Sequence, residues 1–296
     1  MDNFENLLNK YAELSVRVGV NLQKGQTLVI NSPIECAEFT RIVAKEAYKV
    51  GAKEVHVEWS DEELTLIKFM NAPEEAFKEF TKWKAEGYED LAKNGAAFLS
   101  ISASNPELLK DVDPKRIAES NKTRSIALKK YREYIMNSTV SWSIVSIPTK
   151  AWSKKVFPNL SDENAIEKLW ENIFKIVRVD KDDPIDAWND HLDNLQKKVK
   201  FLNEKRFKKL HYISKDTDLT IELPEKHIWA GGGEYNSKQT YFVANMPTEE
   251  VFTLPLKTGV NGKVKSTKPL NYSGNLIDNF TLLFKDGKIV EIGRAS

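Results

Sequence analysis

The stretch that begins at Thr27 and ends at Trp59 reads TLVINSPIECAEFTRIVAKEAYKVGAKEVHVEW. Its first four residues and residues 54–59 are rich in the β-branched and apolar side chains that are typical of strands. Between them, apolar residues recur at helical spacing, after Pro33 and before Gly51, which suit the start and the end of a helix. The stretch therefore predicts a β-α-β unit.

The same alternation of patterns continues on both sides of this unit. Strands are predicted over 97–102 and 139–147. Helices are predicted over 4–18, around 77–83 and over 114–136, 162–179 and 184–202, with Ser161 as an N-cap and Asp183 just before the last helix. Strands separated by helical stretches indicate a mainly parallel sheet that is covered on both faces.

From Phe207 onward the pattern changes to short strands, and Asn261-Gly262 and Asp286-Gly287 suit hairpin turns between several of them. We therefore expect an α/β protein with two domains. Residues 1–206 form an α/β N-terminal domain with a mainly parallel sheet. Residues 207–296 form a β-rich and incomplete second domain.

Composition restricts the class of protein. The chain has 41% hydrophobic and 29% charged residues, which fits a globular protein. Lys and Arg number 44 against 43 Asp and Glu, so no net field favours nucleic acid or an anionic membrane as a partner. A single cysteine, Cys36, suits a reducing compartment, and no apolar run is long enough to span a bilayer. These features predict a cytoplasmic protein.

Several short motifs have a structural interpretation that outweighs the functional one. Gly231-Gly232-Gly233 lacks the setting of a phosphate-binding loop and suits a tight β connection. The basic residues between Lys197 and Lys209 fit a solvated face, and Cys36 fits core packing. The four histidines have no close ligand spacing, although His227 with Trp229 could line a cleft.

Two adjacent carboxylates stand in the stretch NMPTEEVFT, residues 245–253, between a proline turn and an apolar strand. If the chain is extended there, Glu249 and Glu250 point to opposite faces and cannot both enter one site. One of them is then a bystander.

Several stretches of the sequence resemble the thermophilic metallo-aminopeptidase family (aminopeptidase T-like). The resemblance extends over essentially the full chain. The stretches that carry the resemblance are RVGVNL at 17–22, AWSKKVFP at 151–158, DP at 183–184 with Trp188 and His191, TDL at 217–219 with His227 and Trp229, NMPTEEVFT at 245–253, STKPL at 266–270 and GNLI at 274–277.

The resemblance implies a two-metal exopeptidase that releases N-terminal residues from short peptides and works as a homodimer. It makes Glu250 a ligand of a divalent metal such as zinc, cobalt or manganese, and leaves Glu249 facing away or serving the structure. The family's other ligands are expected further along the chain than Glu291, where this sequence reads IGRAS and stops. We therefore expect a truncated chain that lacks most metal ligands and is inactive.

Two other roles stay open on the sequence alone. The first domain could bind a small ligand at its strand ends without catalysis, as open sheets often do. Alternatively, the chain could act only by assembling with another chain through open strand edges.

Overall fold

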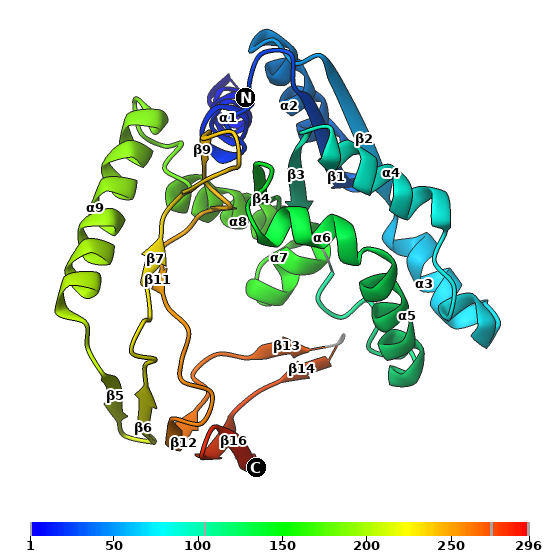
Figure 1. Ribbon diagram of the computed structural model, residues 1–296. Coiled ribbons are helices and arrows are strands. Elements are labelled where there is room, and N and C mark those ends of the chain that lie inside the picture. The colour runs from blue at the N-terminus through cyan, green and yellow to red at the C-terminus, as the bar shows by residue number, and fades with distance from the viewer. Residues whose placement is uncertain (1, 104, 273–274, 295–296) are drawn as a thin grey trace. The chain divides into compact units, whose positions relative to one another are not determined.

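A computed structural model describes residues 2–103, 105–272 and 275–294 (Figure 1). The chain forms two compact units. Unit 1 comprises Met1–Asp190 and Gly233–Thr248, and unit 2 comprises His191–Gly232 and Glu249–Ser296. The domain boundary predicted near Arg206 stays a prediction, since the two units describe only which residues lie close together.

Unit 1 alternates helices with the strands of one sheet. Its helical elements are α1 (Asp2–Leu14), the π-helix η1 (Ser15–Gly19), the 3-10 helix η2 (Ile34–Cys36), α2 (Ala37–Lys49), α3 (Glu62–Asn71), the 3-10 helix η3 (Glu74–Phe77), α4 (Lys82–Lys93), α5 (Pro114–Ala127), α6 (Lys129–Met136), α7 (Lys150–Val156), α8 (Asp162–Ile176) and the beginning of α9 (Pro184–Lys205). Its strands are β1 (Thr27–Pro33), β2 (Glu54–Ser60), β3 (Ala97–Ser102), β4 (Trp142–Ser146), β8 (Glu234–Tyr235), β9 (Tyr241–Phe242) and β10 (Asn245–Met246).

Five of these strands form a sheet in the order β10-β4-β3-β1-β2, and every neighbouring pair is parallel. In the β-α-β unit, Thr27 pairs with Glu54 and Pro33 with Ser60. The predicted parallel sheet is therefore confirmed. Its fifth strand, β10, comes from residues 245–246, far along the chain from the other four strands.

The core of unit 1 lies on both faces of this sheet. Val29 and Phe98 pack under α4 and α6, in a cluster with Ala92 and Val140. Because side chains alternate along a strand, Leu28 and Ile30 point to the opposite face, where α2 contacts β1 and both side chains are fully buried. Burial on both faces explains why β1 reads as a continuous apolar run.

Helix starts in unit 1 follow the predicted capping residues. The Ser161 hydroxyl accepts a hydrogen bond from the Asn164 amide at 3.3 Å, at the first turn of α8. At the start of α9, Asp183 Oδ1 accepts from the amides of Ile185 at 2.9 Å and Asp186 at 3.0 Å.

Three local predictions are wrong. Pro33 ends β1 with an extended backbone, and the helix begins after a short 3-10 turn. The helix predicted over 114–136 is two helices, because the buried Leu128 leaves helical geometry and caps both. Asn261-Gly262 lies within a strand, where a Cβ atom on Gly262 would lie 2.1 Å from the Asp218 carbonyl oxygen.

Unit 2 is rich in antiparallel strands, as predicted. They are β5 (Lys209–Ser214), β6 (Thr217–Glu222), β7 (Ala230–Gly231), β11 (Val251–Phe252), β12 (Val260–Lys265), β13 (Leu270–Tyr272), β14 (Asn275–Ile277), β15 (Phe280–Lys285) and β16 (Lys288–Arg294). The larger sheet has the order β16-β15-β12-β6-β5. Asp286 and Gly287 form the predicted turn between β15 and β16, both with positive φ. Gly274, Ala295 and Ser296 lie outside the described residues.

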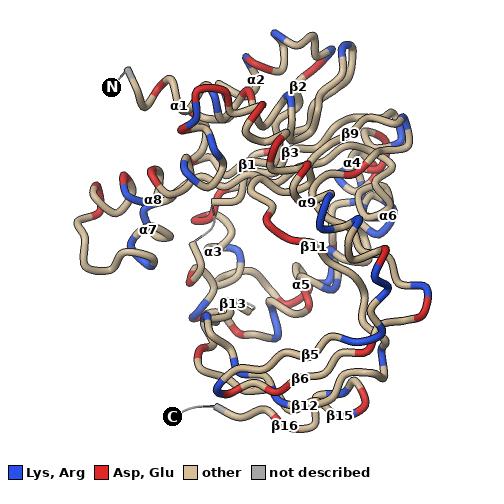
Figure 2. Tube along the Cα trace, turned by 90° about the vertical axis from the view of Figure 1, so that its left-hand side faces the viewer, with Lys and Arg blue, Asp and Glu red and all other residues tan. Residues whose placement is uncertain are grey.

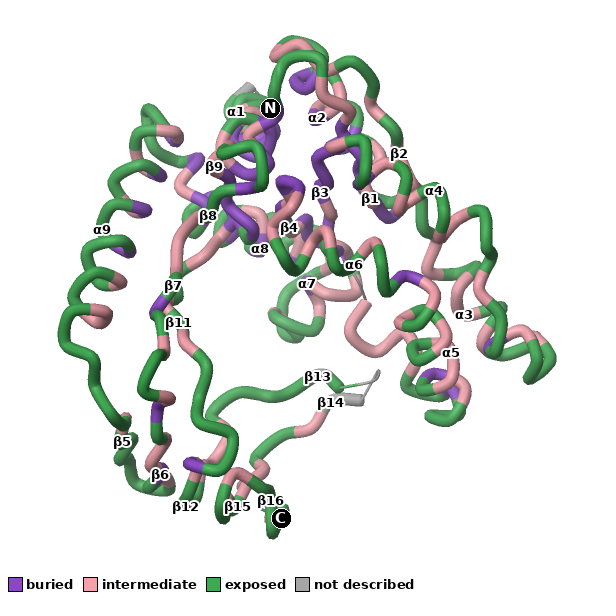
Figure 3. Tube along the Cα trace, viewed as in Figure 1, coloured by how far each residue is buried: buried purple, intermediate pink, exposed green. Residues whose placement is uncertain are grey.

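Charge and burial are distributed differently over the elements. Acidic and basic residues are interspersed along each unit (Figure 2). Burial is densest along β1 and β3, whereas β5 is mostly exposed (Figure 3). Among the described residues, none of the helices combines the length and the apolar character that crossing a membrane requires.

Candidate functional site

The stretch 245–253 is held at both of its ends by strand pairing. At its start, Asn245 pairs with Ile144 and Met246 with Val145 in the parallel sheet, and the Met246-Pro247 peptide bond is cis. At its end, Val251 pairs with Gly231 of β7. The first pairing belongs to unit 1 and the second to unit 2, and Glu249 and Glu250 directly precede the second.

The first end of the stretch also contacts the segment 17–22, which carries another part of the resemblance. The Val243 amide donates to the Gly19 carbonyl oxygen at 2.8 Å. A Cβ atom on Gly19 would lie 3.0 Å from the Met246 Sδ atom and 3.1 Å from the Ser143 hydroxyl. Two stretches that are far apart in the sequence thus pack together inside unit 1.

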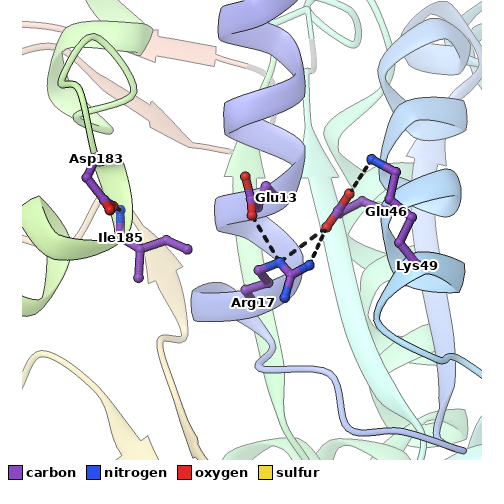
Figure 4. Close-up of polar contacts among 6 residues, drawn as sticks. All are labelled: Glu13, Arg17, Glu46, Lys49, Asp183 and Ile185. Atoms are coloured by element: carbon purple, nitrogen blue, oxygen red, sulfur yellow. Dashed lines mark hydrogen bonds and ion pairs between the residues drawn. The ribbon is translucent and has the colours of Figure 1, made fainter.

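Arg17 of the same segment belongs to an ion-pair cluster (Figure 4). Its guanidinium lies 3.1 Å from Glu13 Oε1 and 3.1 Å from Glu46 Oε1, and Lys49 Nζ lies 2.8 Å from Glu46 Oε2. Glu46 is buried, and these two cations compensate its charge. The cluster joins α1, η1 and α2 and is structural.

The second end of the stretch is fixed by side chains of α9. The Gln196 amide donates to the Gly231 carbonyl oxygen at 2.7 Å. Asn203 exchanges two hydrogen bonds with the backbone of Trp229, at 2.9 and 3.0 Å. Because β7 pairs with β11, α9 thereby positions the backbone that follows Glu250 within unit 2.

The glycines at 231–233 form the tight β connection that the sequence predicts. A Cβ atom on Gly231 would lie 2.7 Å from the Glu250 carbonyl oxygen and 2.9 Å from Val251 Cγ1. Gly232 has a positive φ of 77°. The first glycine lets β7 approach the backbone of Glu250 closely, and the second allows the turn that follows.

The two carboxylates have different surroundings. Glu249 Oε2 lies 3.5 Å from His191 Nε2 of α9, and the side chain of His191 is only 13% exposed. Glu250 is exposed, and within the described part of the chain its carboxylate has no ion pair or side-chain hydrogen bond. Glu249 thus has a side-chain neighbour within ion-pair distance, while the Glu250 carboxylate has none among the described residues. That Glu250 is a metal ligand stays a prediction.

The sequence did not reveal that His191 and Glu249 are partners. They are far apart along the chain, and neither lies in a recognisable ligand spacing with the other. The only sequence signal was that both occur in stretches that carry the resemblance.

His227 and Trp229 pack together, as favoured from the sequence. Their rings make an edge contact with centroids 6.4 Å apart, and His227 Nδ1 lies 2.7 Å from the Pro224 carbonyl oxygen. Trp229 is buried. The basic residues between Lys197 and Lys209 are exposed, which confirms a solvated face. Cys36 is also buried, and burial raises the pKa of its thiol to about 12, so it is an unreactive core residue.

The described side chains do not gather into a donor set that fits a metal ion. In residues 2–103, 105–272 and 275–294, no three His, Cys, Asp or Glu side chains gather closely enough to hold one. Glu250 supplies a single hard oxygen donor, and divalent ions of this kind need several. These residues do not form a metal site by themselves.

A family model described as thermophilic metalloprotease (M29) matches residues 4–296. The chain belongs to this M29 family. Curated relatives of this M29 chain are aminopeptidases. It is 56% identical over 291 residues to Aminopeptidase 2 of Geobacillus stearothermophilus, covering 98% of this chain and 70% of that protein. It is 39% identical over 293 residues to Aminopeptidase T of Thermus aquaticus, covering 99% of this chain and 72% of that protein.

A solved structure agrees with this assignment. The M29 chain is similar to wild-type AmpT from Thermus thermophilus with a TM-score of 0.92 and 37% identity, covering 98% of this chain and 71% of that one. The resemblance that the sequence suggested is therefore confirmed, and so is the mixed α/β fold. The family assignment makes this a chain of metallo-aminopeptidase type.

Proposed function

We propose that this chain contributes Glu250 to the metal centre of an aminopeptidase that releases N-terminal residues from short peptides. The observation that carries the proposal is the position of Glu250. It is an unpaired, exposed carboxylate directly before the paired strand β11, within a chain of the M29 family. Glu249, held by His191, is the neighbour with a structural role.

The proposed centre uses two divalent ions, zinc, cobalt or manganese. When bound, such ions polarise a scissile carbonyl and activate a water molecule. Because one carboxylate cannot hold two ions, we further propose that the 296-residue chain alone binds metal weakly and does not turn over substrate.

The family resemblance further supports a cytoplasmic homodimer with short peptides as substrates. Light scattering on the purified protein measures its mass, and a mass equal to the 33.8 kDa of one chain would contradict the dimer.

The decisive experiment measures hydrolysis of an aminoacyl chromogenic substrate with added cobalt or zinc. It compares this chain with a C-terminally extended version. We expect activity only in the extended version. Strong metal-dependent turnover by the 296-residue chain would contradict its inactivity, and an inactive extended version would contradict the aminopeptidase proposal.

Two matched variants of the extended version test the residue assignment. Glu250→Gln removes the charged oxygen donor and should lower kcat/KM by more than about 100-fold, since even outer-shell residues of metal sites contribute 10- to 100-fold. Glu249→Gln, one position away, should keep most of the activity. Equal losses in both variants would contradict the proposed division of roles.

A further inference from the structure

The carboxyl edge of the parallel sheet carries a cavity that has no part in the proposed metal chemistry. The strand order β2-β1-β3-β4-β10 means that the chain moves outward from β1 in one direction to form β2 and in the other to form β3. The point between β1 and β3 is therefore a topological switch point, where open α/β sheets bind ligands beyond the carboxyl ends of their strands.

A cavity of about 410 Å³ lies at this point. Residues at the ends of three strands line it, among them Asn31 of β1, Trp59 of β2 and Ser100 of β3. Helices α4 and α5 and the start of α6 complete the wall. The volume is within the range of small-molecule sites, and none of the lining residues belongs to the stretch 245–253.

The charges of the wall leave one cation without a partner. Lys84 is ion-paired with Glu58, so these two cancel within the wall. Arg124 also lines the cavity, and among the residues the structure describes it has no ion pair and no side-chain hydrogen bond. The wall thus presents one net positive charge, carried by a planar guanidinium that suits a carboxylate.

Two of the remaining polar groups of the wall, on Asn31 and Tyr131, supply hydrogen-bond donors. The Tyr88 hydroxyl donates to Asn31 Oδ1 at 2.6 Å, which leaves the Asn31 amide N–H groups as donors. Burial raises the pKa of Tyr131 to about 12, so its hydroxyl stays protonated, and the Arg124 charge acts on both tyrosines. Trp59 and Tyr131 also offer flat apolar surface to a ring.

We propose that this cavity is a binding site for a small molecule that carries a carboxylate and a flat aromatic or heterocyclic group. The carboxylate pairs with Arg124, and the ring packs between the aromatic side chains. Phosphate is a poorer match, because only one cation is unpaired. In addition, the end of β1 and the 3-10 helix after it, residues 32–36, read SPIEC and have no glycine to form a phosphate cradle.

Calorimetric titration of the full 296-residue chain tests the site. The probe is indole-3-acetate, and indole-3-acetamide is the neutral control of the same shape. We expect saturable one-to-one binding of the carboxylate, about tenfold tighter than that of the amide, because an ionic hydrogen bond contributes more than a neutral one. Equal affinity for the two compounds, or no saturable binding of indole-3-acetate, overturns the proposal.

Variants locate the site. Arg124→Gln should weaken indole-3-acetate binding about tenfold, whereas Arg41→Gln, at an exposed arginine of α2 that does not line the cavity, should leave it unchanged. Tyr131→Phe removes a hydroxyl while keeping the packed ring, and should weaken binding by a smaller factor. Circular dichroism checks that each variant is folded. Unchanged binding in Arg124→Gln overturns the proposal.

A further titration uses adenosine monophosphate as a phosphate-bearing probe, with adenosine as the control that lacks the phosphate. Weaker binding of the monophosphate than of indole-3-acetate supports a carboxylate site. Tighter, Arg124-dependent binding of the monophosphate would assign the cavity to phosphate and overturn the class that we propose. The titrations require no turnover, so they are informative even if the aminopeptidase proposal fails.

Discussion

Gly231 shows how one atom can control the backbone beside a candidate ligand. Its Cα lies so close to Glu250 that an added Cβ would overlap the Glu250 carbonyl oxygen at 2.7 Å. Gly231 belongs to β7 and Glu250 directly precedes the partner strand β11, so a shift of either backbone would disturb the pairing of β7 with β11.

Gly231→Ala should therefore lower the free energy of unfolding by about 1–3 kcal/mol, the usual cost of overpacking. Gly87→Ala is the matched control. Nothing lies within 4 Å of the new atom there, and Gly87 stands in the interior of α4. That variant should gain up to about 1 kcal/mol from higher helix propensity. Urea denaturation measures both, and equal effects of the same sign would contradict this explanation.

At this scale the sequence predicted what depends on local chemistry. The caps at Ser161 and Asp183 and the burial of Cys36 follow from the residue and its neighbours. The pairing of His191 with Glu249 and the gathering of Arg124 with Tyr88 and Tyr131 depend on tertiary contacts. No spacing rule predicts such contacts from one sequence.

Among the elements, α1, η1 and α2 are joined by the charge cluster around Glu46. The Glu46 side chain is 8% exposed and that of Arg17 is 43% exposed, so the pair lies between a surface and a buried ion pair. Its energy is therefore expected to exceed that of an ordinary surface pair but to remain below that of a fully buried one.

A double-mutant cycle with Arg17→Met and Glu46→Gln should give a coupling energy of about 1 kcal/mol. Lys168 and Glu171 of α8 form the control pair, 2.7 Å apart, with both side chains more than half exposed. Their coupling should be below about 0.5 kcal/mol. Thermal or urea unfolding supplies the four stabilities of each cycle, and a control coupling as large as that of Arg17 with Glu46 would exclude burial as the reason.

Element boundaries were predicted well where the local sequence pattern is clear. Examples are α8, which has a capping residue, and the strand β3. Boundary predictions failed where a tertiary contact outweighs the local pattern. Leu128, a buried residue with good helix propensity, leaves helical geometry between α5 and α6, which its residue type does not predict. Gly262 stays in its strand because the neighbouring strand approaches too closely for any side chain.

Across the whole molecule, burial is uneven. Leu28, Ile30 and Leu99 in the parallel sheet are fully buried, whereas the edge strands of the antiparallel sheet, β5 and β16, are largely exposed. Few described residues of the antiparallel sheet are buried. Its backbone hydrogen bonds should therefore open more often than those of the parallel sheet.

Hydrogen exchange measured by mass spectrometry should therefore be slowest in peptides that cover residues 27–30 and 97–101. Peptides that cover 209–214 and 288–292 should exchange at least about 100-fold faster. Protein prepared at several concentrations serves as the control for self-association. Equal protection of both sheets would contradict a stability difference between the units.

The alternation of helices and strands was sufficient to predict the class of fold, but it did not predict which segment completes the parallel sheet. β10 has only two residues, too few for any periodic pattern, and its pairing with β4 is non-local.

That late strand has a consequence for biosynthesis. A ribosome releases the chain from the N-terminus, and N-terminal domains commonly begin to fold during translation. Here β1 to β4 emerge early, yet β4 keeps an open edge until Met246 has been made. The nascent chain therefore exposes an unpaired strand edge while α9 and the first antiparallel strands are still being synthesised, and this is the interval in which a chaperone would protect it best.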